Sequence, residues 1–154
     1  LHQRLTIDEM IIPCEARMSI IQYISNKNHD RGIKIFALAD AESGYIYDII
    51  PYKGKENGGG VEEEGLGARM VNKLCQGLEG NFHILATDRF FSSPNLCEVL
   101  LSKKIYSIGT VRSNRINFPK SLVNSTKDRG EFNWEMKENG ISAGTLIYIT
   151  NFYL

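Results

Sequence analysis

The chain has 154 residues, of which 42% are hydrophobic and 23% charged, the composition of one ordinary globular domain. It contains no run of 18 apolar residues, so we expect no membrane-spanning helix. Eighteen basic residues balance 18 acidic ones, which argues against a free-standing nucleic-acid binder because such proteins need clustered positive charge. A catalytic core whose binding arms lie elsewhere remains compatible with this charge.

The start of the sequence and its cysteines indicate what kind of protein the chain comes from. The chain begins at Leu1 without a methionine or a signal-peptide pattern, so we expect a fragment of a longer protein, and the cysteines favour an intracellular one. Cys14, Cys75 and Cys97 are widely spaced and form no C-x-x-C pair, which indicates neither a zinc site nor a disulfide framework. We expect Cys75 and Cys97 to be buried free thiols in a reducing compartment.

The first half of the chain reads as strands. Residues 5–12 predict a strand that carries Asp8 in its middle, and residues 19–24 form a short apolar piece of uncertain type. Residues 32–40 and 45–52 are apolar runs separated by short polar residues and a glycine, which predicts a β-hairpin. A glycine- and glutamate-rich stretch then follows, and we expect it to be a mobile loop at about 56–65.

The second half alternates helices and strands. Apolar residues recur at helical spacing over residues 66–78, and a second helix is expected to begin with Ser93 as N-cap and Pro94 at its first position. Residues 114–130 are polar and rich in turn residues. Strands are expected at residues 82–87, 105–111, 131–136 and 140–154.

This order of elements indicates an α/β protein with a mixed sheet and helices on its faces. The order matches the ribonuclease H-like arrangement, in which the first and fourth strands lie side by side and each offers a carboxylate. Asp8 and Asp88 occupy those two places. Two carboxylates at one sheet edge can share a divalent metal, as phosphoryl-transfer sites on nucleic acid require.

Each acidic candidate also has a simpler interpretation. Asp8 could be an exposed acid or the ion-pair partner of Lys34, and Asp88 could complement the dipole of the helix that follows it. Glu9 alternates to the opposite strand face from Asp8, which favours a solvated surface role. Asp40 opens a tight turn, which favours a structural role.

Other polar and aromatic residues are less specific signals. Arg112, Asn114 and Arg115 form a basic, polar loop that could contact phosphates or be merely solvated. His83 lies in an apolar run and is expected to be a hydrogen-bonded core histidine. Trp134, the single tryptophan, is expected in the core rather than on a surface that stacks on bases.

Five segments in order resemble the transposase domain of the piggyBac family of DNA transposons and their domesticated relatives. They are DEMIIP at residues 8–13, QYISNK at 22–27, GIK at 32–34 with DAESGY at 40–45, DRFFSSP at 88–94, and GTVRSNR at 109–115 with Pro119. Each segment is a weak signal alone, whereas five in order at compatible spacing are specific. Under this resemblance residues 1–154 are a partial catalytic domain, with a core at about 1–115 and the start of a β-rich insertion at 116–154.

The resemblance implies a cut-and-paste DNA transposase that acts at TTAA sites with Mg²⁺ or Mn²⁺. Asp8 and Asp88 would be catalytic metal ligands, and Arg112, Asn114 and Arg115 would bind DNA. The implied partner is double-stranded DNA, namely transposon ends and the TTAA target. The resemblance further allows a homodimer and places the protein in the nucleus.

The sequence also departs from the family pattern. The family has a third catalytic aspartate in a downstream glycine-valine-aspartate segment, which nothing after Asp88 matches; Asp128 lies in a turn-like setting. Arg89 replaces the asparagine that usually follows the second aspartate, and an arginine there would compete with a cation for Asp88. We therefore expect a truncated transposase domain that is inactive as this fragment. The alternative is a domesticated, non-enzymatic module that binds DNA or protein.

Overall fold

The structure, a computed structural model, describes residues 1–23, 31–54, 65–124, 128 and 130–146. Most of the loop expected at about 56–65 therefore lies outside the described residues. The strands are β1 (Arg4–Pro13), β2 (Ile21–Tyr23), β3 (Arg31–Asp40), β4 (Ile46–Pro51), β5 (Ile84–Thr87), β6 (Tyr106–Gly109), β7 (Phe132–Met136) and β8 (Ser142–Leu146). The helices are α1 (Leu66–Leu74), α2 (Pro94–Ser102) and α3 (Lys120–Asn124).

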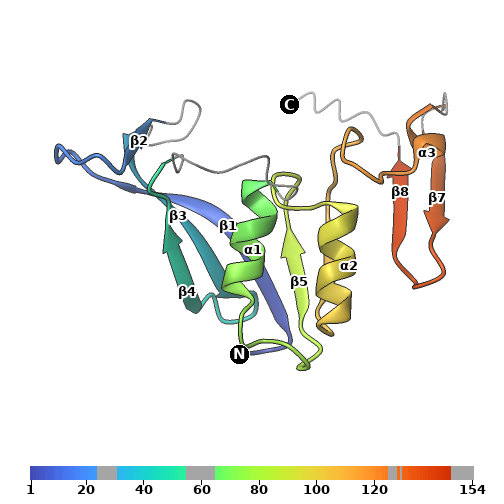
Figure 1. Ribbon diagram of the computed structural model, residues 1–154, viewed down its shortest axis with the longest axis horizontal. Coiled ribbons are helices and arrows are strands. Elements are labelled where there is room, and N and C mark those ends of the chain that lie inside the picture. The colour runs from blue at the N-terminus through green and yellow to red at the C-terminus, as the bar shows by residue number, and fades with distance from the viewer. Residues whose placement is uncertain (24–30, 55–64, 125–127, 129, 147–154) are drawn as a thin grey trace, which may run out of the picture.

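Six strands form one mixed sheet in the order β2-β3-β1-β5-β6, with β4 also paired to β3. β3 runs antiparallel to β1 and to β4, whereas β1, β5 and β6 are mutually parallel. The predicted hairpin and the predicted ribonuclease H-like mixed sheet are both confirmed. β5 is the fourth strand when the three-residue β2 is set aside, and it lies beside β1 as the sequence indicated (Figure 1).

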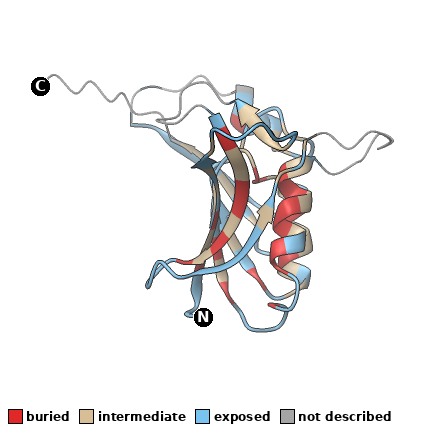
Figure 2. Ribbon diagram, turned by 90° about the vertical axis from the view of Figure 1, so that its left-hand side faces the viewer, coloured by how far each residue is buried: buried red, intermediate tan, exposed pale blue. Residues whose placement is uncertain are grey.

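Helices α1 and α2 cover one face of this sheet (Figures 1 and 2). Because side chains alternate along a strand, every second one points toward these helices. The helices pack their apolar faces against those side chains. Burying each large side chain in this way stabilises the fold by roughly 1.5–3 kcal/mol. The core combines residues of both layers: Leu5, Ile7, Phe36, Leu38, Leu85, Val71, Leu74, Phe91, Leu96, Leu100 and Ile105.

The opposite face of the sheet carries no helix in the described part of the chain (Figure 2). The side chains that alternate to this face include Met10, Ile12, Ile49 and Ile108, which are 40–66% exposed. Asp8 belongs to the same face, since Ile7 before it is buried in the core and strand neighbours point to opposite sides. The sheet is thus apolar on both faces but is covered on one.

Several predicted boundaries need correction. α1 ends at Leu74 rather than at residue 78, because the chain turns at Cys75 and reaches a positive φ of 82° at Gly77. β5 begins at Ile84 rather than at residue 82, since Phe82 adopts a left-handed φ of 56° that a strand cannot contain. α2 begins as predicted, with Ser93 Oγ accepting the Leu96 N–H at 3.2 Å.

The C-terminal part of the described chain forms its own small sheet. β7 and β8 pair antiparallel with each other, and α3, which the turn-rich composition did not predict, precedes them. Trp134 on β7 is 57% exposed, so its expected place in the core was wrong. All five residues of β7 are exposed, because a two-stranded hairpin has no second layer of its own to bury one face.

The cysteines agree only in part with the prediction. Cys75 is buried, and burial raises the pKa of its thiol to about 11; the charge of Lys103 lowers this pKa to a smaller extent, and the charge of Glu79 raises it slightly further. Cys97 and Cys14 are half-buried, so the expectation of a buried Cys97 was wrong. No helix in the described ranges has the length and apolarity needed to cross a bilayer.

Candidate functional site

Asp8 lies inside β1 and Asp88 directly follows the end of β5, and the two positions lie at the same level of the sheet. The parallel register of β1 and β5 ends with the pair Ile7 and Thr87. Asp8 and Asp88 are the next residues on the two strands, and both are exposed. β1 and β5 are therefore neighbours, and the backbones of Asp8 and Asp88 follow the last residue pair of their register.

Each carboxylate makes one local hydrogen bond through Oδ1. Asp8 accepts the N–H of Glu9 at 2.7 Å, and Asp88 accepts the N–H of Phe90 at 2.8 Å. Among the described residues, neither Oδ2 atom has a hydrogen-bond partner, and no group of three or more His, Cys, Asp or Glu residues could hold a metal ion. Two exposed carboxylates fit Mg²⁺, which is commonly bound through one or two carboxylates with waters and substrate phosphates as further ligands.

Backbone and hydroxyl contacts fix the start of the turn that carries Asp88. The carbonyl of Asp88 accepts the Ser92 N–H at 3.0 Å and the Ser92 hydroxyl at 2.9 Å. Ser92 Oγ also lies 2.8 Å from Thr87 Oγ1. Gly109 on β6 packs against this corner, where an added Cβ would meet the Thr87 carbonyl oxygen at 2.1 Å. The Asp88 turn is thereby anchored to the ends of two strands.

Aromatic packing holds the next part of the same turn. Phe91 is fully buried and meets the ring of Phe36 edge-on, while the ring of Phe90 lies parallel to Phe36. The ammonium of Lys34 sits 5.0 Å from the Phe36 centroid and 5.1 Å from the Phe90 centroid, a cation–π arrangement. Arg89 between these anchors is exposed and forms no ion pair with Asp88 in the described structure.

Glu9 and Lys34 form a pair that the sequence analysis assigned differently. Lys34 Nζ lies 3.1 Å from Glu9 Oε2, and both side chains are partly buried. The alternation of Glu9 away from Asp8 is confirmed, but its expected solvated role was wrong. Among the described residues Lys34 forms its ion pair with Glu9 and not with Asp8, which lies on the opposite face of β1.

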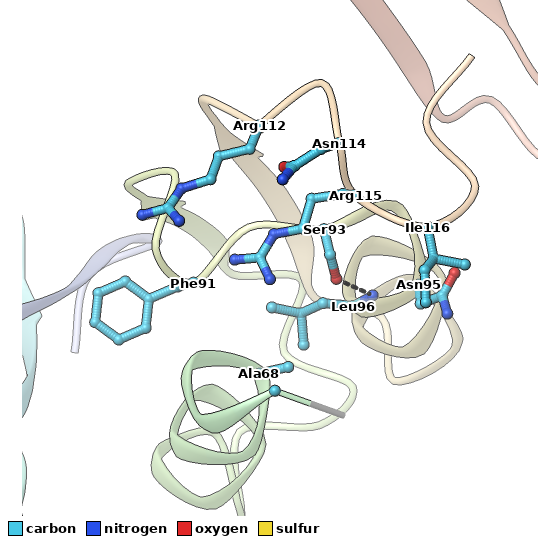
Figure 3. Close-up of a pocket in the computed structure, with 10 residues that line it drawn as sticks. Ala68, Phe91, Ser93, Asn95, Leu96, Arg112, Asn114, Arg115 and Ile116 are labelled. Atoms are coloured by element: carbon cyan, nitrogen blue, oxygen red, sulfur yellow. Dashed lines mark hydrogen bonds between the residues drawn. The ribbon is translucent and has the colours of Figure 1, made fainter. Parts of the chain in front are cut away.

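Arg112, Asn114 and Arg115 come together in the loop after β6. They line a cavity of about 250 Å³ between this loop and the N-terminal ends of α1 and α2 (Figure 3). Apolar side chains form part of the wall, and polar groups surround it. The full lining is Gly65, Ala68, Phe91, Ser93, Asn95, Leu96, Arg112, Asn114, Arg115 and Ile116.

The remaining candidates take structural or surface positions. Asp40 is buried and accepts the N–H groups of Glu42 and Ser43, which agrees with its predicted role in the turn. His83 is buried as expected, but its Nδ1 has no hydrogen-bond partner among the described residues, so it is not the fully hydrogen-bonded histidine that was predicted. Asp128 is exposed in the segment before β7.

Sequence reasoning missed the contacts that support the site. The Glu9–Lys34 pair, the stacking of Phe90 and the hydrogen bonds from Arg115 to the Asp88 turn all join residues far apart in the chain. The one signal in the sequence was the aromatic pair Phe90 and Phe91, which follows Asp88 after one residue and indicates a turn that packs back against the core.

Comparison with known proteins identifies relatives of this arrangement. Residues 1–147 match the family described as Transposase IS4. The chain is also similar to a solved structure, the cryo-EM structure of the piggyBac transposase synaptic complex with hairpin DNA. The two share 30% sequence identity with a TM-score of 0.78 over 88% of this chain, which spans 29% of the length of that chain.

Proposed function

This chain belongs to the transposase IS4 family, and from that premise we propose that it carries the metal-binding part of a DNA transposase catalytic domain. In the proposed reaction, phosphodiesters are cut and rejoined at TTAA sites, and Asp8 and Asp88 hold the divalent metal. The observation that carries the proposal is the β1–β5 register. Ile7 and Thr87 are the last residues paired in it, and Asp8 and Asp88 are the residues that follow them on the two strands. No other pair of exposed carboxylates in the described ranges directly follows the last paired residues of two adjacent parallel strands.

The family generally uses a divalent metal, and Mg²⁺ or Mn²⁺ suits the oxygen donors present. When bound, such an ion lowers the pKa of a water and neutralises charge on a leaving oxygen. The residues of this chain contribute the orientation: the Asp88 turn is anchored by Ser92 and by Phe91, and Asp8 sits within a ten-residue strand. A carboxylate held in this way loses little conformational freedom when it binds a cation.

The loop after β6 is proposed to contact DNA through Arg112, Asn114 and Arg115. They surround a cavity beside the Asp88 turn, and Arg112 and Asn114 are exposed at its mouth. Arginine and asparagine side chains are frequent donors to phosphate oxygens. Action on chromosomal DNA would place the protein in the nucleus, and cutting at two transposon ends would suit a homodimer.

The division of the chain is part of the same proposal. Residues up to about 115 hold the six-stranded sheet, whereas β7 and β8 form a separate two-stranded sheet. We assign the first part to the catalytic core and residues 116–154 to the start of a β-rich insertion. Asp8 and Asp88 are the two proposed ligands, and no cluster of three or more potential ligands occurs among the described residues, so the chain by itself should bind a metal loosely and should be deficient in strand transfer.

Calorimetric titration with Mn²⁺ tests the proposed metal pair. Asp8→Ala and Asp88→Ala should each weaken binding by at least about tenfold, because each removes a charged oxygen ligand. Asp48→Ala is a matched control, since Asp48 is exposed and its Oδ1 accepts the N–H of the next residue at 2.8 Å, as that of Asp8 does. Binding that survives unchanged in both site variants would refute the metal site.

A non-enzymatic DNA- or protein-binding module is the second candidate. The exposed Arg89 next to Asp88 favours it, because a guanidinium there lowers the attraction for a cation. Gel-shift and cleavage assays with a duplex containing TTAA, with and without Mg²⁺, separate the two functions. Nicked product supports the enzyme, whereas a shifted band without product at any metal concentration supports the binding module.

A further inference from the structure

The guanidinium of Arg115 reaches from the loop after β6 to the turn that follows Asp88. Its Nη2 donates to the carbonyl of Phe90 at 2.7 Å and to the carbonyl of Arg89 at 3.2 Å. We propose that Arg115 is a positioning residue for Asp88, in addition to any phosphate contact that its side chain makes. This inference rests on the proposed metal pair and names a residue that controls the geometry of that pair.

One peptide group connects the Arg115 guanidinium to the Asp88 carboxylate. The carbonyl of Arg89 and the N–H of Phe90 are the two ends of the same planar peptide unit, so orienting one end orients the other. Arg115 donates to the carbonyl end, and the N–H end donates to Asp88 Oδ1 at 2.8 Å. The arginine therefore sets the direction of the hydrogen bond that holds the Asp88 carboxylate, and a charged donor polarises the peptide and strengthens that bond.

Close packing leaves the turn little room on the opposite side of the Phe90 carbonyl. A Cβ added to Gly67 in α1 would meet that carbonyl oxygen at 2.6 Å, so α1 approaches the turn more closely than another residue would permit. The carbonyl is thus enclosed by the α1 backbone and by the Arg115 guanidinium. The hydroxyl and ring contacts of Ser92 and Phe91 anchor other parts of the turn and leave the Arg89–Phe90 peptide to Arg115.

The same side chain also borders the cavity that contains Arg112 and Asn114. Nη1 of Arg115 lies 3.9 Å from the position of a Cβ built on Gly65, and the side chain extends into the pocket from the loop (Figure 3). The buried Nε has no hydrogen-bond partner among the described residues. A guanidinium is a rigid plane with donors on several edges, so one edge can hold the turn while another faces an anion in the cavity.

Arg31 provides a matched control at the far end of the sheet. Its Nη1 and Nη2 donate to the carbonyls of Glu15 and Ala16, each at 3.2 Å, so it also bridges two consecutive carbonyls. Arg31→Ala removes the same kind of interaction without touching the Asp88 turn. Arg115→Lys retains one charged donor but loses the planar fork, and it serves as the partial-rescue variant.

The test combines Mn²⁺ affinity with amide hydrogen exchange in the 154-residue chain. Arg115→Ala should weaken Mn²⁺ binding about tenfold, as expected for loss of a residue that orients a ligand. It should also speed exchange of the Phe90 N–H in the absence of metal, whereas Arg31→Ala should change neither quantity. Arg115→Lys should fall between Arg115→Ala and the unmodified chain in both measurements.

Three outcomes have distinct meanings. Unchanged Mn²⁺ affinity and unchanged Phe90 exchange in Arg115→Ala would overturn the positioning role even if Asp88→Ala abolishes binding. An equal loss of affinity in Arg115→Ala and Arg31→Ala would overturn it as well, because that result reports general destabilisation. Absence of Mn²⁺ binding in the unmodified chain would contradict the proposed function, and Phe90 exchange would still decide whether Arg115 fixes the turn.

Discussion

Asp40 and Asp88 both close an apolar strand of the same sheet and both open a turn, yet their carboxylates have different surroundings. Asp40 is 2% exposed and all of its contacts are with the chain itself. Its Oδ1 accepts the N–H groups of Glu42 and Ser43, and its Oδ2 accepts the N–H of His2 at 2.6 Å and lies 2.9 Å from the imidazole Nδ1. Both oxygens of Asp40 are therefore occupied by the protein.

Asp88 is exposed and accepts a single backbone N–H, while the turn around it is held by other atoms. The carbonyl of Asp88, the hydroxyl of Ser92 and the guanidinium of Arg115 supply the contacts that the Asp40 carboxylate supplies to its own turn. The comparison shows how one local pattern, an apolar strand followed by aspartate, produces two different groups. A carboxylate is available to a ligand when neighbouring residues hold its turn for it.

A methyl group at Gly109 should produce the largest effect. Its Cβ would meet the Thr87 carbonyl oxygen at 2.1 Å and Ser92 Oγ at 2.7 Å, so Gly109→Ala should force β5 and β6 apart at the Asp88 turn. We expect a loss of about 3 kcal/mol in the free energy of unfolding measured with urea. Gly44→Ala in the Asp40 turn has open space and a φ of 73°, so about 1 kcal/mol is expected there. Equal losses would mean that the Asp88 turn is not tightly packed.

Removing the Asp40 carboxylate should lower the stability of the fold more than removing the Asp88 carboxylate. Asp40→Ala should lower the midpoint of thermal unfolding by about 5 °C, because it leaves the N–H groups of His2, Glu42 and Ser43 without their acceptor. Asp88→Ala should lower the midpoint by no more than about 2 °C, since it removes one hydrogen bond from an exposed group. Differential scanning calorimetry without added metal measures both, and the reverse order would contradict the comparison.

Acid should weaken the Asp40 turn. The N–H of His2, followed by those of Ser43 and Glu42, holds the pKa of the Asp40 carboxyl well below its usual value, against the opposing effect of burial. A lowered folded-state pKa adds stability above the unfolded-state value of roughly 4, and this contribution is lost as the pH falls toward the lower folded-state pKa. The difference in thermal midpoint between the unmodified chain and Asp40→Asn should therefore narrow below about pH 4. A difference that stays constant down to about pH 2 would show that the charge of Asp40 is irrelevant.

The smallest expected effect is on the rate of thiol labelling at Cys75. This rate reports whether Asp88→Ala loosens the packing of the core. Burial raises the pKa of the Cys75 thiol to about 11, so at about pH 8 Cys75 should react far more slowly than Cys14 and Cys97, which are half-buried. Mass spectrometry after alkylation resolves the three sites. Asp88→Ala should leave Cys75 protected, and rapid labelling of Cys75 in that variant would indicate damage that reaches α1.

The strands that end at Asp40 and Asp88 could be predicted from the sequence, whereas the contacts around the two carboxylates could not. Periodicity and composition were enough for β1, the hairpin, the start of α2 and the pairing of β1 with β5, because these features follow from local alternation and a known order of elements. The exposure of Trp134 was not predictable from its own apolar strand, since burial depends on whether a second layer covers that strand. The Glu9–Lys34 pair depends on the register between β1 and β3, which local patterns do not specify.

The site divides in the same way. Asp8 and Asp88 were found as carboxylates that follow apolar residues, and the basic loop was found from composition. The contact from Arg115 to the Arg89 and Phe90 carbonyls was not found, because a side chain that donates to backbone atoms leaves no signal in the residues that accept. Local patterns therefore identify candidate ligands, whereas the residues that orient them emerge only from tertiary structure.

The sheet face that bears Asp8 has a practical consequence for handling the molecule. Met10, Ile12, Ile49 and Ile108 lie on this face in contact with solvent. Broad apolar surfaces of this kind adhere to one another in water, so the purified chain should self-associate as its concentration rises. Light scattering across a dilution series should detect this self-association, and a mild detergent or a charged substitution at Ile108 should suppress it.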